Sequence, residues 1–130
     1  MTLTTESLWG ALPDELPGPP VLVTVVGAPG SLNALAEQLP AHWIVRSAAL
    51  EDVGDTDLLV IGRATGHRVA AAVRQHPGTP VVGLLDSYAP AEQVVEVLEA
   101  GADACVRSGQ PALVGSHLRA CHRRRGPAWH

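Results

Sequence analysis

The chain is poor in aromatic residues, contains no lysine and has very little sulfur. Its 130 residues include three Trp, one Tyr and no Phe, so any core has to be built from Val, Leu, Ile and Ala. All nine basic residues are arginine, a bias to which we give no mechanistic meaning. The two cysteines, Cys105 and Cys121, form neither a disulfide framework nor a zinc-binding pattern. The composition predicts a reduced protein held together by aliphatic packing.

Long apolar runs are also missing. No stretch approaches the ~18–20 apolar residues that a membrane-spanning helix needs. The N-terminus has neither a charged start nor an apolar signal segment. These absences predict a soluble, cytoplasmic protein that makes no membrane contact.

The charge distribution argues against direct nucleic-acid binding. The net charge is −4, whereas nucleic-acid-binding domains usually carry a basic face. Four of the nine arginines gather near the C-terminus, at Arg119 and at residues 123–125. This cluster is open to two interpretations, a set of phosphate contacts or a solvated helix end whose cations complement the helix dipole. The second is favoured, because nucleic-acid interfaces usually need several phosphate contacts over a broad face.

Composition divides the chain into three parts. Residues 1–20 form a Pro-rich arm, in which five of the last eight residues are Pro or Gly. Leu8, Trp9 and Leu12 could form one apolar helical turn, so the arm either docks on a surface or is a disordered leader. Residues 21–125 carry regular patterning, at a size typical of one domain of ~100–150 residues. Residues 126–130 form a short C-terminal tail.

Apolar runs alternate with helical patterns throughout residues 21–125. Runs at 21–26, 43–45, 58–61, 80–85 and 104–106 predict five buried strands. Helical spacing, with Ser31 as a cap of the first helix, predicts helices at 31–39, 65–76, 90–100 and 111–124. Only about a dozen residues separate the second and third strands, so the helix between them should be short or irregular. The alternation predicts an α/β, flavodoxin-like, doubly wound parallel sheet of strand order 2-1-3-4-5.

Three segments resemble, in order, parts of response-regulator receiver domains. Residues 57–62 (DLLVIG) resemble the "DLVLLD" strand of that family, and residues 80–85 (PVVGLL) resemble its "PVI-x-L-T" strand. Residues 101–108 (GADACVRS) resemble the "GAD-x-Y-x-x-K" entry into its last strand. The resemblance covers about residues 21–122 and implies the receiver fold.

The same resemblance identifies what this chain lacks. Gly62 stands where the family keeps its phospho-accepting aspartate, and Leu85 stands where it keeps a hydroxyl that contacts the phosphoryl group. Ser108 replaces the expected lysine. The resemblance therefore implies a degenerate, or pseudo-receiver, domain that cannot be phosphorylated on aspartate.

The metal site of the family is missing as well. Its acidic pair falls at Val26 and Gly27, neither of which can ligate Mg²⁺, which prefers carboxylate oxygens. The aromatic residue whose rotamer reports phosphorylation falls at Cys105. The resemblance thus implies a non-enzymatic domain with no catalytic residue, no metal and no cofactor.

Three aspartates are candidates for replacing the missing acceptor. Asp57 and Asp103 precede their strands, so we expect them at the amino end of the sheet, opposite the site. Asp86 follows the fourth strand and lies at the correct end. It either binds a cation or partner or, as loop aspartates more often do, stabilises a turn.

Two further patterns have a chemical and a plain interpretation. Residues 27–31 (GAPGS) lie between a strand and a helix, as a phosphate-binding loop would, but residues 32–34 (LNA) lack its Gly-Lys-Ser/Thr. A tight turn is the preferred interpretation. His117 and Cys121 are spaced i, i+4 and could share a metal, but no clear third ligand is nearby. We expect Cys121 to pack inward with Val114 and Leu118.

The resemblance implies a regulatory or scaffolding module that acts through protein contacts. Receivers signal through the surface formed by the fourth helix, the fifth strand and the last helix. Acidic and basic residues on these adjacent helices suit reciprocal pairing across a two-fold axis, so a homodimer or another protein partner is expected there. The residues expected on this interaction face are Glu92, Val95, Glu96, Glu99, Gln110, His117 and Arg119.

Two alternatives stay open at this point. The emptied phosphorylation pocket, lined by Val26, Gly27, Gly62, Leu85 and Ser108, could sense a small molecule. The chain could also be the receiver-like part of a larger regulator, because five residues after Arg125 cannot form an output domain.

Overall fold

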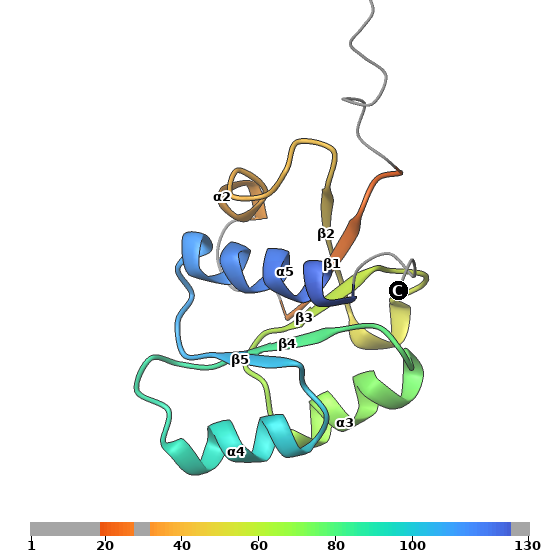
Figure 1. Cartoon of the computed structure of the whole chain (residues 1–130). Coiled ribbons are helices and arrows are strands. Elements are labelled where there is room, and N and C mark those ends of the chain that lie inside the picture. The colour runs from red at the N-terminus through yellow and green to blue at the C-terminus, as the bar shows by residue number, and fades with distance from the viewer. Residues whose placement is uncertain (1–18, 28–31, 126–130) are drawn as a thin grey trace, which may run out of the picture.

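The computed structural model describes residues 19–27 and 32–125, the side chain of Arg125 excepted. It contains one five-stranded parallel sheet of order β2-β1-β3-β4-β5, which confirms the predicted fold class (Figure 1). The strands are β1 Leu22–Val26, β2 Ile44–Ala48, β3 Leu58–Ile61, β4 Val81–Leu84 and β5 Ala104–Val106. The expected turn at Leu8–Leu12, the cap Ser31 and the tail 126–130 lie outside the described residues.

Helices cover both faces of the sheet. In Figure 1, α3 and α4 lie on one face, and α2 and α5 lie on the other. The helices are α2 Leu32–Ala36, α3 Gly66–Gln75, α4 Ala91–Glu99 and α5 Pro111–Arg125. The predicted shortening of the helix between β2 and β3 is confirmed, since only the 3₁₀ turn η2, Leu50–Asp52, stands there.

Local chemistry explains where these helices begin and end. The hydroxyl of Thr65 accepts a hydrogen bond from the backbone N–H of Arg68 at 3.1 Å, which caps α3. Pro111 opens α5, where its missing N–H costs nothing. Gly101 follows α4 with φ of 118°, a conformation that glycine adopts without strain.

Two layers of aliphatic side chains form the core, one on each face of the sheet. All four residues of β3 are fully buried, with Leu58 and Val60 facing α2 and α5 and with Leu59 and Ile61 facing α3 and α4. This is why the central strands read as continuous apolar runs. The α5 layer contains Leu35, Leu39, Trp43, Val114, Leu118 and Cys121, and the α4 layer contains Ala64, Val69, Ala72, Leu85, Ala89 and Val97.

The second strand is longer than its apolar pattern predicted. It runs over Ile44–Ala48 rather than 43–45, because polar residues continue along an edge strand that is half exposed. Trp43 precedes the strand and packs against the ring of His122 on α5, with ring centroids 5.0 Å apart. A prediction based on apolar runs ends too early at such an edge.

Arg46 of β2 hydrogen-bonds a buried side chain of the neighbouring strand β1. Thr24 of β1 is completely buried, and its hydroxyl donates to Oγ1 of Thr56 at 2.9 Å and accepts from Nε of Arg46 at 3.1 Å. Arg46 also donates to the carbonyl of Asp55. This network satisfies the one buried polar side chain of the described core, which would otherwise destabilise it.

Candidate functional site

The residues expected to line a degenerate phosphorylation pocket end or follow the strands at the carboxyl end of the sheet. Val26 and Leu85 are buried there, and the N–H of Gly62 donates to the carbonyl of Val26 at 2.8 Å. The hydroxyl of Ser108 accepts from the N–H of Gln110 at 3.0 Å, at the turn that leads into α5. Among these residues, the structure therefore shows buried apolar side chains and backbone hydrogen bonds at the carboxyl ends of the strands.

The guanidinium of Arg68 lies beside Gly27, one of the two positions at which the resemblance puts the acidic pair of the receiver family. A Cβ built on Gly27 would lie 3.2 Å from Nη2 of Arg68 and 3.6 Å from the carbonyl oxygen of Gly62. Gly27 has φ of 71°, so any other residue there would be strained as well as crowded. Sequence reasoning missed this guanidinium, because Arg68 lies on α3, 41 positions away along the chain.

The three aspartates lie where the sequence predicted, and all act as backbone acceptors. Asp57 accepts from the N–H of Leu22 at 2.8 Å, and Asp103 accepts from the N–H of Val81 at 2.8 Å, both at the amino end of the sheet. Asp86 lies at the carboxyl end and accepts from the N–H of Tyr88 at 2.8 Å. This contact is the turn-stabilising role expected of a loop aspartate.

Neither cysteine is placed for nucleophilic chemistry. Burial raises the pKa of the half-buried Cys105 thiol, and the positive charge of Arg107 opposes that effect. Burial also raises the pKa of Cys121, which packs with Val114 and Leu118 as predicted. A thiol that stays protonated is a poor nucleophile and metal ligand. Within residues 19–27 and 32–125, no three His, Cys, Asp or Glu side chains gather to hold a metal ion.

Two residues expected on the interaction face point elsewhere. Oε2 of Glu96 accepts from the N–H of Gly66 at the start of α3, at 3.0 Å. Arg119 donates to the carbonyl of Gln38, which follows α2. Glu96 on α4 thus points toward α3, and Arg119 on α5 points toward α2. Neither side chain points toward β5. Reciprocal pairing of Glu96 with Arg119 across a two-fold axis is not supported by this arrangement.

Apolar side chains occupy the side of α4 that faces away from α3. Successive residues of a helix are 100° apart, so Leu98 lies about 200° around α4 from Glu96. Leu98 is 44% exposed, and Val95, next to it on this side, is 49% exposed. On α5, Leu113 is 43% exposed and lies about 200° around from Gly115, which packs on Gln38.

Val95, Leu98 and Leu113 are the exposed large apolar residues of α4 and α5, and we refer to these three residues together as the α4–α5 apolar patch. Figure 1 shows β5 between the two helices that carry them. The expected residues Glu92, Glu99 and Gln110 are exposed, and His117 is half-buried one turn after Leu113. Leu98 and Leu113 were not predicted, because exposure of an apolar helical residue depends on which neighbouring helix covers it.

Four of the five residues of the expected GAPGS turn, 28–31, lie outside the described part of the chain. Among the helices that the structure describes, none has the length and apolar character to span a bilayer.

Comparison with known proteins identifies the fold. No family model and no curated protein matches the sequence. The response regulator DrrB of Thermotoga maritima, an OmpR/PhoB homolog, superposes with a TM-score of 0.66 at 19% identity, over 82% of this chain and 54% of that one. This chain thus spans about half the length of that structure.

Two smaller structures are covered almost completely. The CheY-like protein TadZ of Pseudomonas aeruginosa superposes with a TM-score of 0.58 at 23% identity, over 87% of this chain and 97% of that one. The ChxR receiver domain of Chlamydia trachomatis gives a TM-score of 0.51 at 19% identity, over 81% and 98%. Together with the strand order, these similarities show that the chain has the fold of a response-regulator receiver domain.

Proposed function

We propose that this chain is a non-phosphorylatable receiver-like module that regulates or scaffolds other proteins through direct contact. The proposal is supported by the chemistry of the carboxyl end of the sheet. Gly62 offers no acceptor, Val26 and Gly27 offer no metal ligand, and Arg68 brings a positive charge to their place. These positions therefore offer no carboxylate that could accept a phosphoryl group or bind Mg²⁺.

The α4–α5 apolar patch is the observation that carries the proposal. It holds three of the five large apolar side chains that are exposed in the described structure. Single exposed apolar residues are ordinary, and we propose that these three, on the two helices that flank β5, act together as an interaction site. The exposed Glu92, Glu99 and Gln110 lie on the same two helices or at their start, so a polar rim can surround an apolar centre.

The partner proposed first is a second copy of this chain. A two-fold axis beside β5 would place the patch of one copy against the same patch of the other copy. An apolar surface can be self-complementary in this way without paired charges. This arrangement replaces the expected Glu96–Arg119 pairing with apolar burial. A different protein with a matching apolar surface is the second possibility that the experiment separates.

The test is a charge placed in the patch. We expect Val95→Asp combined with Leu113→Asp to abolish self-association of the full chain, measured by light scattering across a concentration series. The matched control is Ile44→Asp, because Ile44 is 47% exposed but lies on β2, at the opposite edge of the sheet. At protein concentrations below those at which the wild type associates, thermal melting should stay close to wild type in both variants, since exposed positions contribute little to stability.

The outcomes distinguish the two partners. A wild-type dimer that the patch variant alone disrupts supports self-association. A monomeric wild type that captures a host protein, with capture lost only in the patch variant, supports a different protein partner. A monomeric wild type whose captured partners bind the patch variant equally well would contradict the proposed face.

A second candidate function is binding of a small anion at the carboxyl end of the sheet. The observation that favours it is the guanidinium of Arg68 beside Gly27, which makes no ion pair within the described residues. Titration with inorganic phosphate should then shift the amide resonances of Gly27 and Gly62. Arg68→Gln should remove these shifts, whereas Arg74→Gln, in the exposed last turn of the same helix, should not.

We further propose that this chain works with a larger regulator, either as its receiver-like domain or as a separate protein that binds it. The support is that DrrB, which resembles the chain in fold, is about twice the length of the region shared with it.

A further inference from the structure

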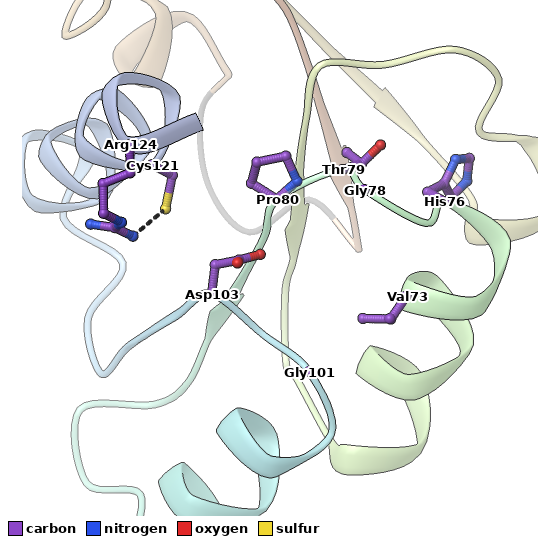
Figure 2. Close-up of a pocket in the computed structure, with 9 residues that line it drawn as sticks. All are labelled: Val73, His76, Gly78, Thr79, Pro80, Gly101, Asp103, Cys121 and Arg124. Atoms are coloured by element: carbon purple, nitrogen blue, oxygen red, sulfur yellow. Dashed lines mark hydrogen bonds between the residues drawn. The ribbon is translucent and has the colours of Figure 1, made fainter. Parts of the chain in front are cut away.

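A pocket of about 380 Å³ opens at the amino end of the sheet, opposite the degenerate phosphorylation site. Its walls come from the end of α3, the loop into β4, the loop into β5 and the last turns of α5 (Figure 2). The lining residues that matter for binding are Val73, His76, Pro80, Asp103, Cys121 and Arg124. Its volume lies in the lower part of the range of about 300–1,000 Å³ that small-molecule sites occupy.

Two opposite charges line this pocket without neutralising each other. In the described part of the chain, Asp103 and Arg124 make no ion pair with each other or with any third residue. Figure 2 shows Asp103 in the middle of the site, Arg124 on the α5 side and Val73 on the α3 side. Opposite charges that share a cavity without contact leave room for a ligand that bridges them.

Each charged group has binding capacity to spare. Nη2 of Arg124 donates to Sγ of Cys121 at 3.2 Å, a weak acceptor that uses one of five guanidinium donors. Oδ2 of Asp103 accepts from the N–H of Val81 at 2.8 Å, and no described group donates to the other carboxylate oxygen. The guanidinium can therefore take a carboxylate, and the free oxygen can take an ammonium group.

The rest of the wall is mixed in character. Val73 and Pro80 supply apolar surface between the charges and the end of α3. Nε2 of His76 is covered and has no hydrogen-bond partner within the described residues, although a buried polar atom without a partner is costly.

We propose that this pocket binds a small zwitterion of the α-amino-acid class. The ligand carboxylate pairs with Arg124, the ammonium group pairs with Asp103, and an apolar side chain lies against Val73 and Pro80. An anion without an ammonium group would be repelled by the carboxylate of Asp103. A cation without a carboxylate would be repelled by the guanidinium of Arg124.

The inference is independent of the α4–α5 apolar patch. The pocket is nevertheless built from the ends of the same elements, because Asp103 precedes β5 and Arg124 lies in the last turns of α5. Binding would therefore join α3, β5 and α5 through one ligand.

The experiment is an amide-resonance titration of the ¹⁵N-labelled full chain with the natural L-α-amino acids, one at a time at millimolar concentration. The amides of Gly78 and Gly101, which line the pocket, report binding, and those of Gly54 and Gly109 serve as remote controls. We expect at least one amino acid to shift the first pair in a saturable way. Its deaminated and decarboxylated analogues should each bind about tenfold or more weakly, as expected for the loss of one charge-assisted contact.

Two substitutions test the assignment of the charges. Asp103→Asn keeps an acceptor for Val81 but removes the charge, and Arg124→Gln removes the guanidinium. Each should weaken binding about tenfold, whereas Arg123→Gln, exposed on the same helix turn and outside the pocket, should leave binding unchanged. If Asp103→Asn does not fold, Arg124→Gln decides alone.

Three results would each overturn the proposal. These are no saturable shift of Gly78 and Gly101 with any amino acid, analogues that bind as tightly as the parent, or full affinity in the Arg124→Gln variant. Loss of the proposed dimer in the patch variant leaves all three measurements intact, so the two proposals fail separately.

Discussion

The carboxylate of Glu96 on α4 accepts a hydrogen bond from the backbone N–H of Gly66, the first residue of α3, with 3.0 Å between Oε2 and N. The start of a helix carries free N–H groups and a positive dipole end, so an anion from a neighbouring element stabilises it. A Cβ built on Gly66 would lie 2.8 Å from Cγ and Oε2 of Glu96, which is why a glycine stands at this approach. The contact fixes α4 against α3 and leaves the opposite side of α4 to the apolar patch.

The first prediction concerns this contact. Glu96→Gln removes the charge but not the side-chain volume, and we expect it to lower the free energy of unfolding by about 0.5–1 kcal/mol. Glu99→Gln is the control, since Glu99 is exposed at the end of the same helix. Urea denaturation of both variants is the measurement. Equal midpoints for the two would mean that the charge of Glu96 does not hold α3 and α4 together.

The second prediction tests the core between the sheet and α5. Leu118 is completely buried, so Leu118→Ala should cost about 2–5 kcal/mol of stability through lost burial and a cavity. Leu113→Ala, on the same helix but 43% exposed, should change stability by less than about 1 kcal/mol in dilute solution, where the chain is monomeric. A comparable loss in both variants would show that Leu113 is covered in solution, as it would be in the proposed dimer at high protein concentration.

The two explanations of such a loss can be separated by dilution. A contribution of Leu113 that comes from a dimer interface depends on protein concentration, because only association is governed by mass action. The contribution of Leu118 to the fold of one chain does not.

The third prediction concerns phosphorylation. Incubation with a small phosphodonor, or with beryllofluoride and Mg²⁺, should leave the mass and the amide spectrum unchanged. The reasons are Gly62 at the acceptor position, Val26 and Gly27 at the metal position, and the guanidinium of Arg68 beside them. Gly62→Asp alone should not restore phosphorylation, because it supplies an acceptor without the acidic pair, at Val26 and Gly27, that would help to hold Mg²⁺. A mass increase of one phosphoryl group in either protein would contradict this reading.

The fold could be predicted from the sequence because its patterns are local. Continuous apolar runs such as residues 58–61 appear wherever both faces of a strand are covered, and their alternation with helical spacing requires a parallel sheet. The shortening of the second helix could be predicted because only about a dozen residues separate Val45 from Leu58 along the chain. The extension of β2 through Arg46 did not, because an edge strand tolerates polar residues.

The functional surfaces were harder to predict because they combine segments that are distant in sequence. The pocket joins Val73, Asp103 and Arg124, whose separation no local pattern encodes. The approach of the Arg68 guanidinium to Gly27 depends on how α3 packs relative to β1. Glu96 was expected on the interaction face, but its partner Gly66 can be identified only once the packing of α3 on α4 is known.

The last prediction concerns the two thiols and pH. Burial raises the pKa of both Cys105 and Cys121, while Arg107 opposes the shift at Cys105 and Arg124 opposes it at Cys121. Because the thiolate is the nucleophile, iodoacetamide should alkylate both cysteines of the native protein more slowly than a free thiol with an ordinary pKa of about 8.5 at neutral pH. Cys121 should be the slower of the two, since it is buried in the core.

The sign of the effect on stability follows from the same shift. A pKa that is higher in the folded than in the unfolded chain favours folding below the unfolded value and ceases to do so as pH rises through the folded value. Stability should therefore decline above about pH 8.5, where unfolded thiols ionise. Arg107→Gln sharpens the test, because removing the positive charge should raise the pKa of Cys105 further and slow its alkylation without changing that of Cys121. Faster alkylation of Cys105 in that variant would show that Arg107 acts by covering the thiol through its contact with the carbonyl of Ala89, and not by its charge.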